Sequence, residues 1–435
     1  MNWENYVVKL NVKSKVIDFN HPLNEYETLN TSGTGFFISN KEILTCYHVV
    51  TGAVNIEILF NQTNSLNGTI KHIFPDDDLA IVQLENELPD AKILPHKIIN
   101  NRLTGDVFTV GFPLSSTNIK ITKGIISGYQ ESLIQTDAAL NHGNSGGPLV
   151  IFDESEGDYQ VIGVNVSKLK GNSEKTGFVV PIYRFQILKP LIANTTNIVI
   201  KKPCLFFDFQ DLTQDKLRAS LFKNKIGEIP DKSGIRVTTT NEDYYHAKYI
   251  NPNDVILAVN NNPVDYNGYV KFDFYPEKIP LDDIGLWFVE NDIICLKTFN
   301  PETLAFNNVS FEMKPVKSNL MNYYLLDSYP NYFVENNGLI LSVFTEQHLE
   351  NLKNLNIGIS KLVKILARRL YHKDLFTVYL ADINYKKING RINYPIGEII
   401  TEINDKTFNK LEEFMEITKS KIFKIKTIEN EVFFI

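Results

Sequence analysis

The sequence contains few cysteines and no long hydrophobic run, and each absence excludes a class of protein. Only three cysteines occur among 435 residues, and Cys46, Cys204 and Cys295 are far apart and odd in number. This spacing argues against a disulfide framework and fits a reducing compartment. No stretch of about 18 uncharged apolar residues is present, so we expect no helix that spans a membrane.

A basic excess and a leader segment are also missing. The net charge is -7 and the lysines are scattered, so nothing electrostatic favours nucleic acid or an anionic membrane as a partner. Residues 1–6 contain no basic stretch followed by an apolar run, which argues against a secretory or transit signal. We therefore expect the cytoplasm or another reducing compartment, with a virion or an organelle left open.

The chain does contain a change of pattern near its middle. Residues 1 to about 195 carry short apolar runs separated by Gly, Asn, Asp and Pro, a pattern typical of an all-β barrel or sandwich. After Lys201-Lys202-Pro203 the pattern becomes mixed α and β. A chain of this length exceeds one ordinary core, so we expect roughly two to four domains.

A weak internal repeat lies in the second half of the chain. Residues 253–264 resemble residues 396–408, because each copy reads as a strand, a tight Asn-rich turn and a short strand. In the second copy a helical stretch follows at residues 410–418. Two copies roughly 145 residues apart predict two related modules with an insertion between them.

The strongest motif surrounds Ser145, in Gly143-Asn144-Ser145-Gly146-Gly147-Pro148, directly before an apolar strand. A serine nucleophile needs an accessible Oγ and backbone N–H groups aimed at the developing oxyanion. The flanking glycines permit such a turn because they tolerate positive φ. We therefore interpret Ser145 as a nucleophile, with the amides of Gly143, Asn144 and Ser145 as an oxyanion hole. A simple glycine-rich hairpin loop is the alternative.

A serine nucleophile also requires a base and a carboxylate that orients the base. His48 ends a β-type run that follows the glycine-rich residues 32–39, which makes it the candidate base. Asp78 leads directly into an apolar strand and is the candidate carboxylate, whereas we expect Asp76 and Asp77 to be solvated turn residues. The order His, Asp, Ser is that of chymotrypsin-type enzymes. His142 is interpreted as part of the cleft rim. The remaining histidines are interpreted as structural or exposed: His21, His72, His96, His246, His348 and His372.

Around these residues the chain resembles the HtrA/Deg serine proteases, nearest their plant Deg2/Deg9-like branch. The segments that carry the resemblance are residues 45–50, 78–82, 110–113, 122–127, 135–148, 177–181, 233–237, 253–257, 329–333 and 338–341. The resemblance implies an all-β chymotrypsin-like double β-barrel protease domain at residues 1–200, with the active site between the barrels. It also implies two α+β PDZ-like domains, the first at residues 201–316 and an extended second at residues 317–435.

The activity implied by the resemblance is ATP-independent cleavage of unfolded or damaged proteins, without a metal or another cofactor. The pocket for the residue before the cut (P1) is expected to be lined by Ala139, Leu140, Val164, Asn165 and Val166. These residues include no acid, so we expect small or medium apolar P1 residues. Members of the family assemble through N-terminal aromatic residues, which makes Trp3 and Tyr6 candidates for the contacts of a homo-oligomer, a trimer or larger. Ordinary strand-edge packing is the alternative for both rings.

Two departures from the family pattern keep a second function open. Tyr47 precedes His48 where the family usually has a small residue, and the stretch from Ile126 to Gln135 is too short for the family's sensor loop. Both departures favour a chaperone or scaffold with weak or no proteolysis. The presence of all three candidate residues for a His-Asp-Ser triad argues against it.

Overall fold

The computed structural model divides into two compact units, and each is described by itself. Unit 1 comprises Met1–Lys13, Asn30–Val50 and Asn55–Val316, and unit 2 comprises Ser14–Leu29, Thr51–Val54 and Lys317–Ile435. The structure describes all residues except 19–21, 25–26, 62–63, 100–104, 131, 167–176, 206, 241–244, 316–332, 346–375, 385–386, 388–393 and 395. Residues 329–332, His21, His348 and His372 therefore lie outside the described residues. Within the described ranges, no helix is both long and apolar enough to cross a membrane.

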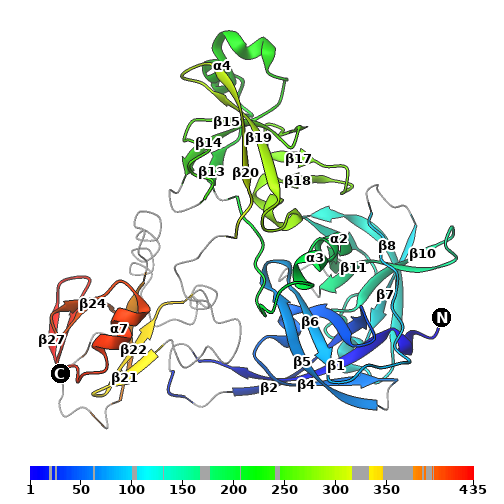
Figure 1. The fold of residues 1–435 in the computed structure, drawn as a ribbon, viewed down its shortest axis with the longest axis horizontal. Helices are drawn as coiled ribbons and strands as arrows, with labels where there is room; N and C mark the ends of the chain where they lie inside the picture. The colour runs from blue at the N-terminus through cyan, green and yellow to red at the C-terminus, as the bar shows by residue number, and fades with distance from the viewer. Residues whose placement is uncertain are drawn as a thin grey trace. The chain divides into compact units, whose positions relative to one another are not determined.

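Six strands close into a first barrel in the order β1-β2-β3-β6-β5-β4 (Figure 1). Their bounds are β1 (Val7–Val16), β2 (Glu27–Phe37), β3 (Glu42–Cys46), β4 (Ala53–Phe60), β5 (Asn64–Phe74) and β6 (Leu79–Leu84). Successive residues of a strand point to opposite faces. Ile56, Ile58 and Phe60 of β4 are accordingly buried, while Glu57 and Leu59 between them are less so.

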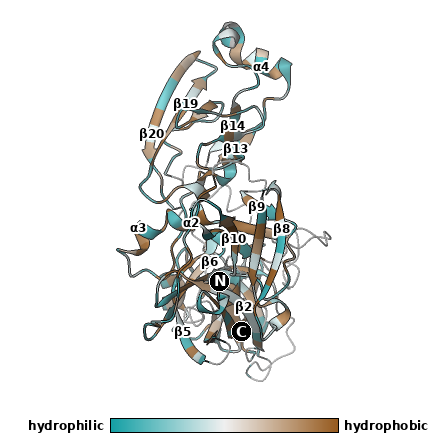
Figure 2. Ribbon diagram, turned by 90° about the vertical axis from the view of Figure 1, so that its right-hand side faces the viewer, coloured by the Kyte–Doolittle hydropathy of each residue, from teal (hydrophilic) through white to brown (hydrophobic). Residues whose placement is uncertain are grey.

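Six further strands close into a second barrel in the order β10-β11-β12-β9-β8-β7. Their bounds are β7 (Asp106–Gly111), β8 (Lys120–Gln130), β9 (Leu133–Thr136), β10 (Pro148–Asp153), β11 (Asp158–Val166) and β12 (Gly177–Pro181). The strands carry hydrophobic segments (Figure 2), and their core contains Val107, Ile134, Leu140, Leu149, Ile151, Ile162 and Val179. The short helices α2 (Ile182–Gln186) and α3 (Lys189–Ile192) follow β12. The expected double β-barrel is thereby confirmed.

A first C-terminal module, residues 207–312, contains a sheet in the order β13-β14-β15-β19-β20, with β16 paired to β15. The bounds are β13 (Phe207–Gln210), β14 (Ile235–Thr240), β15 (Val255–Val259), β16 (Asn262–Pro263), β19 (Ile293–Asn300) and β20 (Ala305–Glu312). A small sheet of β17 (Tyr269–Lys271) and β18 (Lys278–Pro280) lies beside it, with α4 (Asp215–Phe222), η4 (Lys223–Glu228) and η5 (Leu281–Trp287). Trp287 is fully buried in the core of this module.

A second C-terminal module, residues 333–434, repeats this plan. Its sheet runs in the order β21-β22-β23-β24-β26-β27, with β25 paired to β24. The bounds are β21 (Phe333–Asn336), β22 (Leu339–Val343), β23 (Val378–Ile383), β24 (Ile399–Ile403), β25 (Lys406–Thr407), α7 (Leu411–Ile417), β26 (Lys424–Thr427) and β27 (Val432–Phe434). Phe414 of α7 is buried against the sheet. Both modules combine strands with short helices, as the expected α+β class requires.

The internal repeat corresponds to one hairpin in each module. β15 turns into β16 through Asn260 and Asn261, with φ of 47° and 66°. β24 turns into β25 through Asn404 and Asp405, with φ of 51° and 62°. Two consecutive positive φ angles define the type I′ turn, which suits Asn and Asp. The predicted strand–turn–strand repeat is confirmed, and the helix predicted at residues 410–418 appears as α7.

His96 lies in the connection between the two barrels, where it is half-buried. Its neighbours tie the connection to β11, since Val161 N–H donates to the Pro95 carbonyl and Lys97 N–H donates to the Val161 carbonyl, each at 2.8 Å. The ring lies edge-on to Phe185 at 6.1 Å between centroids. Burial, and secondarily the charge of a nearby lysine, lowers the pKa of His96 to about 4.

We expect His96 to make the fold sensitive to acid between pH 6.5 and about 4. Below pH 6.5 the histidine of the unfolded chain binds a proton, while folded His96 does not. The free energy of unfolding therefore decreases as the pH is lowered through this window, by up to roughly 3 kcal/mol. Urea unfolding from pH 7 to pH 4 should show a shallower loss for His96→Leu than for the wild type. His142→Leu, which removes an exposed histidine, serves as the control, and equal slopes for all three proteins would refute the assignment.

Candidate active site

The candidate catalytic residues stand on three turns at the ends of barrel strands. His48 lies in the short helix α1 (Tyr47–Val50), directly after β3. Asp78 lies between the 3-10 turn η2 (Pro75–Asp77) and β6. β3 and β6 pair with Cys46 opposite Leu79, so the residues that follow β3 and precede β6 are neighbours. Ser145 comes from the second barrel, in the turn before β10.

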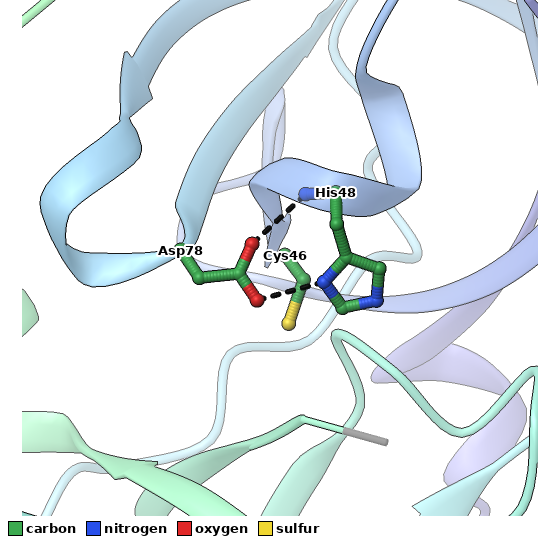
Figure 3. Close-up of side chains that lie close together, drawn as sticks. All are labelled: Cys46, His48 and Asp78. Atoms are coloured by element: carbon green, nitrogen blue, oxygen red, sulfur yellow. Dashed lines mark hydrogen bonds and ion pairs between the residues drawn. The ribbon is translucent and has the colours of Figure 1, made fainter. Parts of the chain in front are cut away.

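Asp78 holds His48 through both carboxylate oxygens (Figure 3). The His48 backbone N–H donates to Asp78 Oδ1 at 2.9 Å. His48 Nδ1 lies 2.7 Å from Asp78 Oδ2. A proton on Nδ1 satisfies this contact and leaves Nε2 to accept a proton from another group. The carboxylate thus sets both the orientation and the tautomer of the imidazole.

The backbone of Asp78 adopts an unusual conformation to make these contacts. Its φ of 51° and ψ of 39° lie in the left-handed region, which costs a non-glycine residue about 1–3 kcal/mol and persists only where the surroundings impose it. The Asp78 N–H donates to the Pro75 carbonyl at 3.2 Å. The expectation that Asp77 is a solvated turn residue is wrong, because its side chain is fully buried in an ion pair with Arg184.

The turn that carries Ser145 is anchored to the first barrel by Thr34. Thr34 Oγ1 donates to the Gly143 carbonyl at 2.6 Å, and Thr34 N–H donates to the Ser145 carbonyl at 2.9 Å. Gly143 has φ of +96°, and a Cβ there would come within 2.3 Å of the Phe112 carbonyl oxygen. Only glycine fits this position without a shift of backbone. The sequence singled out the glycine-rich strand around Thr34 but not this contact.

One of the three backbone N–H groups expected to form an oxyanion hole is hydrogen-bonded within its own turn. The Asn144 N–H donates to the Asn141 carbonyl at 3.0 Å within the turn, so that turn would have to open before Asn144 could serve an oxyanion. Gly143 and Ser145 line a cleft of about 430 Å³ together with His48 and Val166. The cleft therefore brings the candidate base from one barrel to the candidate nucleophile of the other.

Comparison with known proteins agrees with this geometry. Residues 33–164 match the trypsin-like peptidase domain family. The chain is 24% identical over 387 residues to putative protease Do-like 3, mitochondrial, of Arabidopsis thaliana, covering 83% of this chain and 65% of that protein. It is 29% identical over 248 residues to putative serine protease HhoA of Synechocystis sp., covering 53% and 61%. The chain is similar to the HtrA/Deg serine proteases.

The chain spans less than two thirds of the length of these two relatives. A solved structure, the HtrA-type protease AlgW with decapeptide, matches with a TM-score of 0.51 at 21% identity and covers 72% of this chain and 97% of that one. This likeness shows a shared fold.

Of the five expected pocket residues, Val166 lines the cleft. Ala139 is exposed, and its carbonyl accepts from a threonine hydroxyl at 3.0 Å. Leu140 packs in the core of the second barrel. Val164 and Asn165 are fully buried, because β11 is covered along most of its length.

The rim of the cleft contains a residue that the sequence pattern did not single out. Leu114 lines the cleft and is 74% exposed. Its φ is 52°, and its N–H donates to the His142 carbonyl at 2.6 Å. The preceding Gly-Phe-Pro motif of the HtrA/Deg family was the available signal, because proline directly before a residue often marks a turn.

Cys46, His48 and Asp78 also place one nitrogen, one sulfur and one oxygen within 4.8 Å of one another (Figure 3). A cysteine must be a thiolate to bind a metal well. Burial, and secondarily the charge of Asp78, raises the pKa of the Cys46 thiol well above its usual value. The thiol donates to the Asn165 carbonyl at 3.2 Å. These donors therefore suit a packed core beneath the histidine and do not fit a metal.

Proposed function

We propose that this protein is a serine endopeptidase of the HtrA/Deg type that uses His48, Asp78 and Ser145 as a triad. The observation that carries the proposal is the doubly hydrogen-bonded His48–Asp78 pair beside a cleft that Ser145 also lines. A serine becomes nucleophilic when an oriented base can take its proton. The order of the three residues along the chain supports the same reading.

The proposed mechanism follows from the roles that this geometry allows. Ser145 Oγ attacks the scissile carbonyl while His48 Nε2 takes the serine proton. Asp78 stabilises the imidazolium, and the amides of Gly143 and Ser145 face the oxyanion. His48 then gives its proton to the leaving amine, and water releases the acyl group by the same route. These steps need neither ATP nor a metal.

The proposed substrates are unfolded or damaged proteins. An extended segment of an unfolded chain can enter a surface cleft, whereas a folded protein presents few such segments. Names of similar proteins, among them the probable periplasmic serine endoprotease DegP-like of Rickettsia conorii, fit proteolysis. We also propose a reducing compartment, which suits the free thiols of Cys46, Cys204 and Cys295.

Ser145→Ala should abolish both casein degradation and labelling by a fluorophosphonate probe. The alanine removes Ser145 Oγ, the nucleophile that both reactions require. Asp78→Asn should retain the fold and slow peptide hydrolysis by about 10⁴-fold, because the amide supports the wrong histidine tautomer. Wild-type protein that binds unfolded casein but shows no Ser145-dependent label would instead support a chaperone without proteolysis.

Cleavage should favour small or medium apolar P1 residues such as Ala, Val, Ile or Leu. Val166 supplies an apolar wall to the cleft, and an apolar pocket discriminates by size rather than by charge. Mass spectrometry of the products from a peptide library gives the P1 profile. Val166→Phe should shift that profile towards Ala, and a strong preference for Lys or Arg would contradict the assignment.

We further propose that the chain forms a homo-oligomer, a trimer or larger, through its N-terminal aromatic residues. Trp3 packs edge-on against Tyr159 of its own chain at 5.0 Å between centroids. Phe152 lies next to the same tyrosine and is 48% exposed. These rings form a partly exposed aromatic patch of the kind that marks a protein contact.

Trp3→Ala should shift the mass measured by light scattering towards that of the monomer. Tyr269→Ala removes a 41% exposed aromatic ring of the first C-terminal module and should leave the mass unchanged. A wild-type protein that is monomeric at all concentrations would refute the proposal.

A further inference from the structure

Of three consecutive aspartates, Asp78 contacts His48, whereas Asp76 and Asp77 both contact Arg184 and Lys202. Asp78 orients His48, as described above. Asp77 points the other way and is enclosed, with 0% of its side chain exposed. Asp76 is part-exposed and accepts a backbone N–H from Lys202 through Oδ2 at 2.8 Å. Residues that do not line the cleft therefore hold the turn η2 in place.

Arg184 of α2 donates two hydrogen bonds to this turn. Its Nε donates to Asp77 Oδ1 at 2.6 Å, and one terminal nitrogen donates to the Asp76 backbone carbonyl at 3.2 Å. The planar guanidinium suits such a two-point contact, which a lysine ammonium cannot reproduce. The Arg184 side chain is only 4% exposed, so water cannot replace either bond.

Lys202 completes the cluster from the segment that leads into the first C-terminal module. Its side chain is 3% exposed, and Nζ lies 3.6 Å from Asp77 Oδ2. Nζ also donates to the Phe288 carbonyl at 3.4 Å. Burial, opposed by the charge of Asp77, lowers the pKa of Lys202 to about 8. At neutral pH the Lys202 ammonium is therefore charged and pairs with Asp77, although its burial costs free energy.

The helix that supplies Arg184 is itself fixed in place. Tyr183, the preceding residue, stacks on Phe274 of the first C-terminal module at 4.9 Å between centroids with a 4° angle between the rings. Phe185, the following residue, is fully buried. Arg184 therefore projects from a rigid support, and the position of the turn cannot drift with a mobile side chain.

These contacts explain how Asp78 can keep its left-handed backbone conformation. Such a conformation persists only where the surroundings over-determine it. A buried carboxylate with two buried cations is a strong constraint, because removal of one member leaves an uncompensated charge away from water. The cluster is centred on Asp77, the residue directly before Asp78.

We infer that Arg184 and Lys202 are positioning residues, which with Asp77 form a buried ion cluster that fixes the Asp78 turn and so holds Asp78 against His48. The consequence for hydrolysis rests on the proposed function. The consequence for the His48–Asp78 hydrogen bond does not, because that bond is a property of the folded chain. The two can therefore be measured separately.

The decisive variant is Arg184→Met in the full-length protein, with Arg184→Lys as the conservative change. Arg184→Met should lower kcat for a peptide substrate by about 10- to 100-fold with little change in KM, since a catalytic group is misplaced while the substrate cleft stays intact. Arg184→Lys should restore part of the loss. Arg218→Met is the matched control, because Arg218 is similarly buried and binds backbone carbonyls within the first C-terminal module.

A proton NMR signal provides a readout that does not depend on hydrolysis. The hydrogen-bonded Nδ1 proton of His48 should give a downfield signal in the wild type, identified by its absence from His48→Ala. We expect the signal to weaken or vanish in Arg184→Met and to persist in Arg218→Met. An unchanged signal and unchanged kcat in Arg184→Met would overturn the inference.

Two further outcomes are distinguishable. Absence of hydrolysis by the wild type would refute the proposed function, while the NMR comparison would still decide whether the cluster positions Asp78. If Arg184→Met fails to fold, the triple variant Asp77→Leu, Arg184→Met and Lys202→Met replaces all three members of the buried cluster by apolar groups, which often restores folding. That variant should fold by circular dichroism yet lack the His48 signal, and a retained signal would count against the inference.

Discussion

The hydrogen-bonded pair of His48 and Asp78 is the contact on which the rest of the site depends. Strands β3 and β6 pair in a register that places Cys46 opposite Leu79, so the residues just beyond the strand ends meet. The carboxylate then accepts a hydrogen bond from the His48 backbone N–H with one oxygen and faces the ring with its second oxygen. A barrel that closed in another register would separate the two side chains, whatever their local sequence.

The two barrels are connected at the site by polar contacts as well as by packing. Thr34 of β2 in the first barrel binds the carbonyls of Gly143 and Ser145 in the second. Buried threonines of this kind must find partners, because an unpaired hydroxyl away from water is costly. The contact fixes the turn that carries Ser145 relative to the strand ends that carry His48. The geometry of the proposed active site across two barrels thus depends on a residue that has no chemical role of its own.

The acidic run before β6 shows how local patterns can mislead. Adjacent aspartates usually lie in solvated turns, yet Asp77 is buried against Arg184, which is more than 100 residues away in the chain. The position of Asp78 directly before an apolar strand distinguishes it, but no local feature distinguishes Asp77 from Asp76. Asp77 is buried because Arg184 of α2 and Lys202 of the segment after α3 both contact this turn.

The sequence by itself determined the kinds of element and the candidate chemical groups. Alternating apolar runs specify strands, paired Asn and Asp residues specify the type I′ turns at residues 260–261 and 404–405, and the glycines around Ser145 specify a turn that only glycine tolerates. These features are local, since they depend on side-chain periodicity and on backbone sterics.

Tertiary structure alone decided which distant groups meet. It brought Val166 to the cleft while it buried Val164 and Asn165 on the same strand. It joined Asp77 to Arg184 and Lys202, and it placed the Cys46 thiol beneath the histidine. The physical reason is that burial and ion pairing are set by what covers a residue, and the covering elements come from remote parts of the chain.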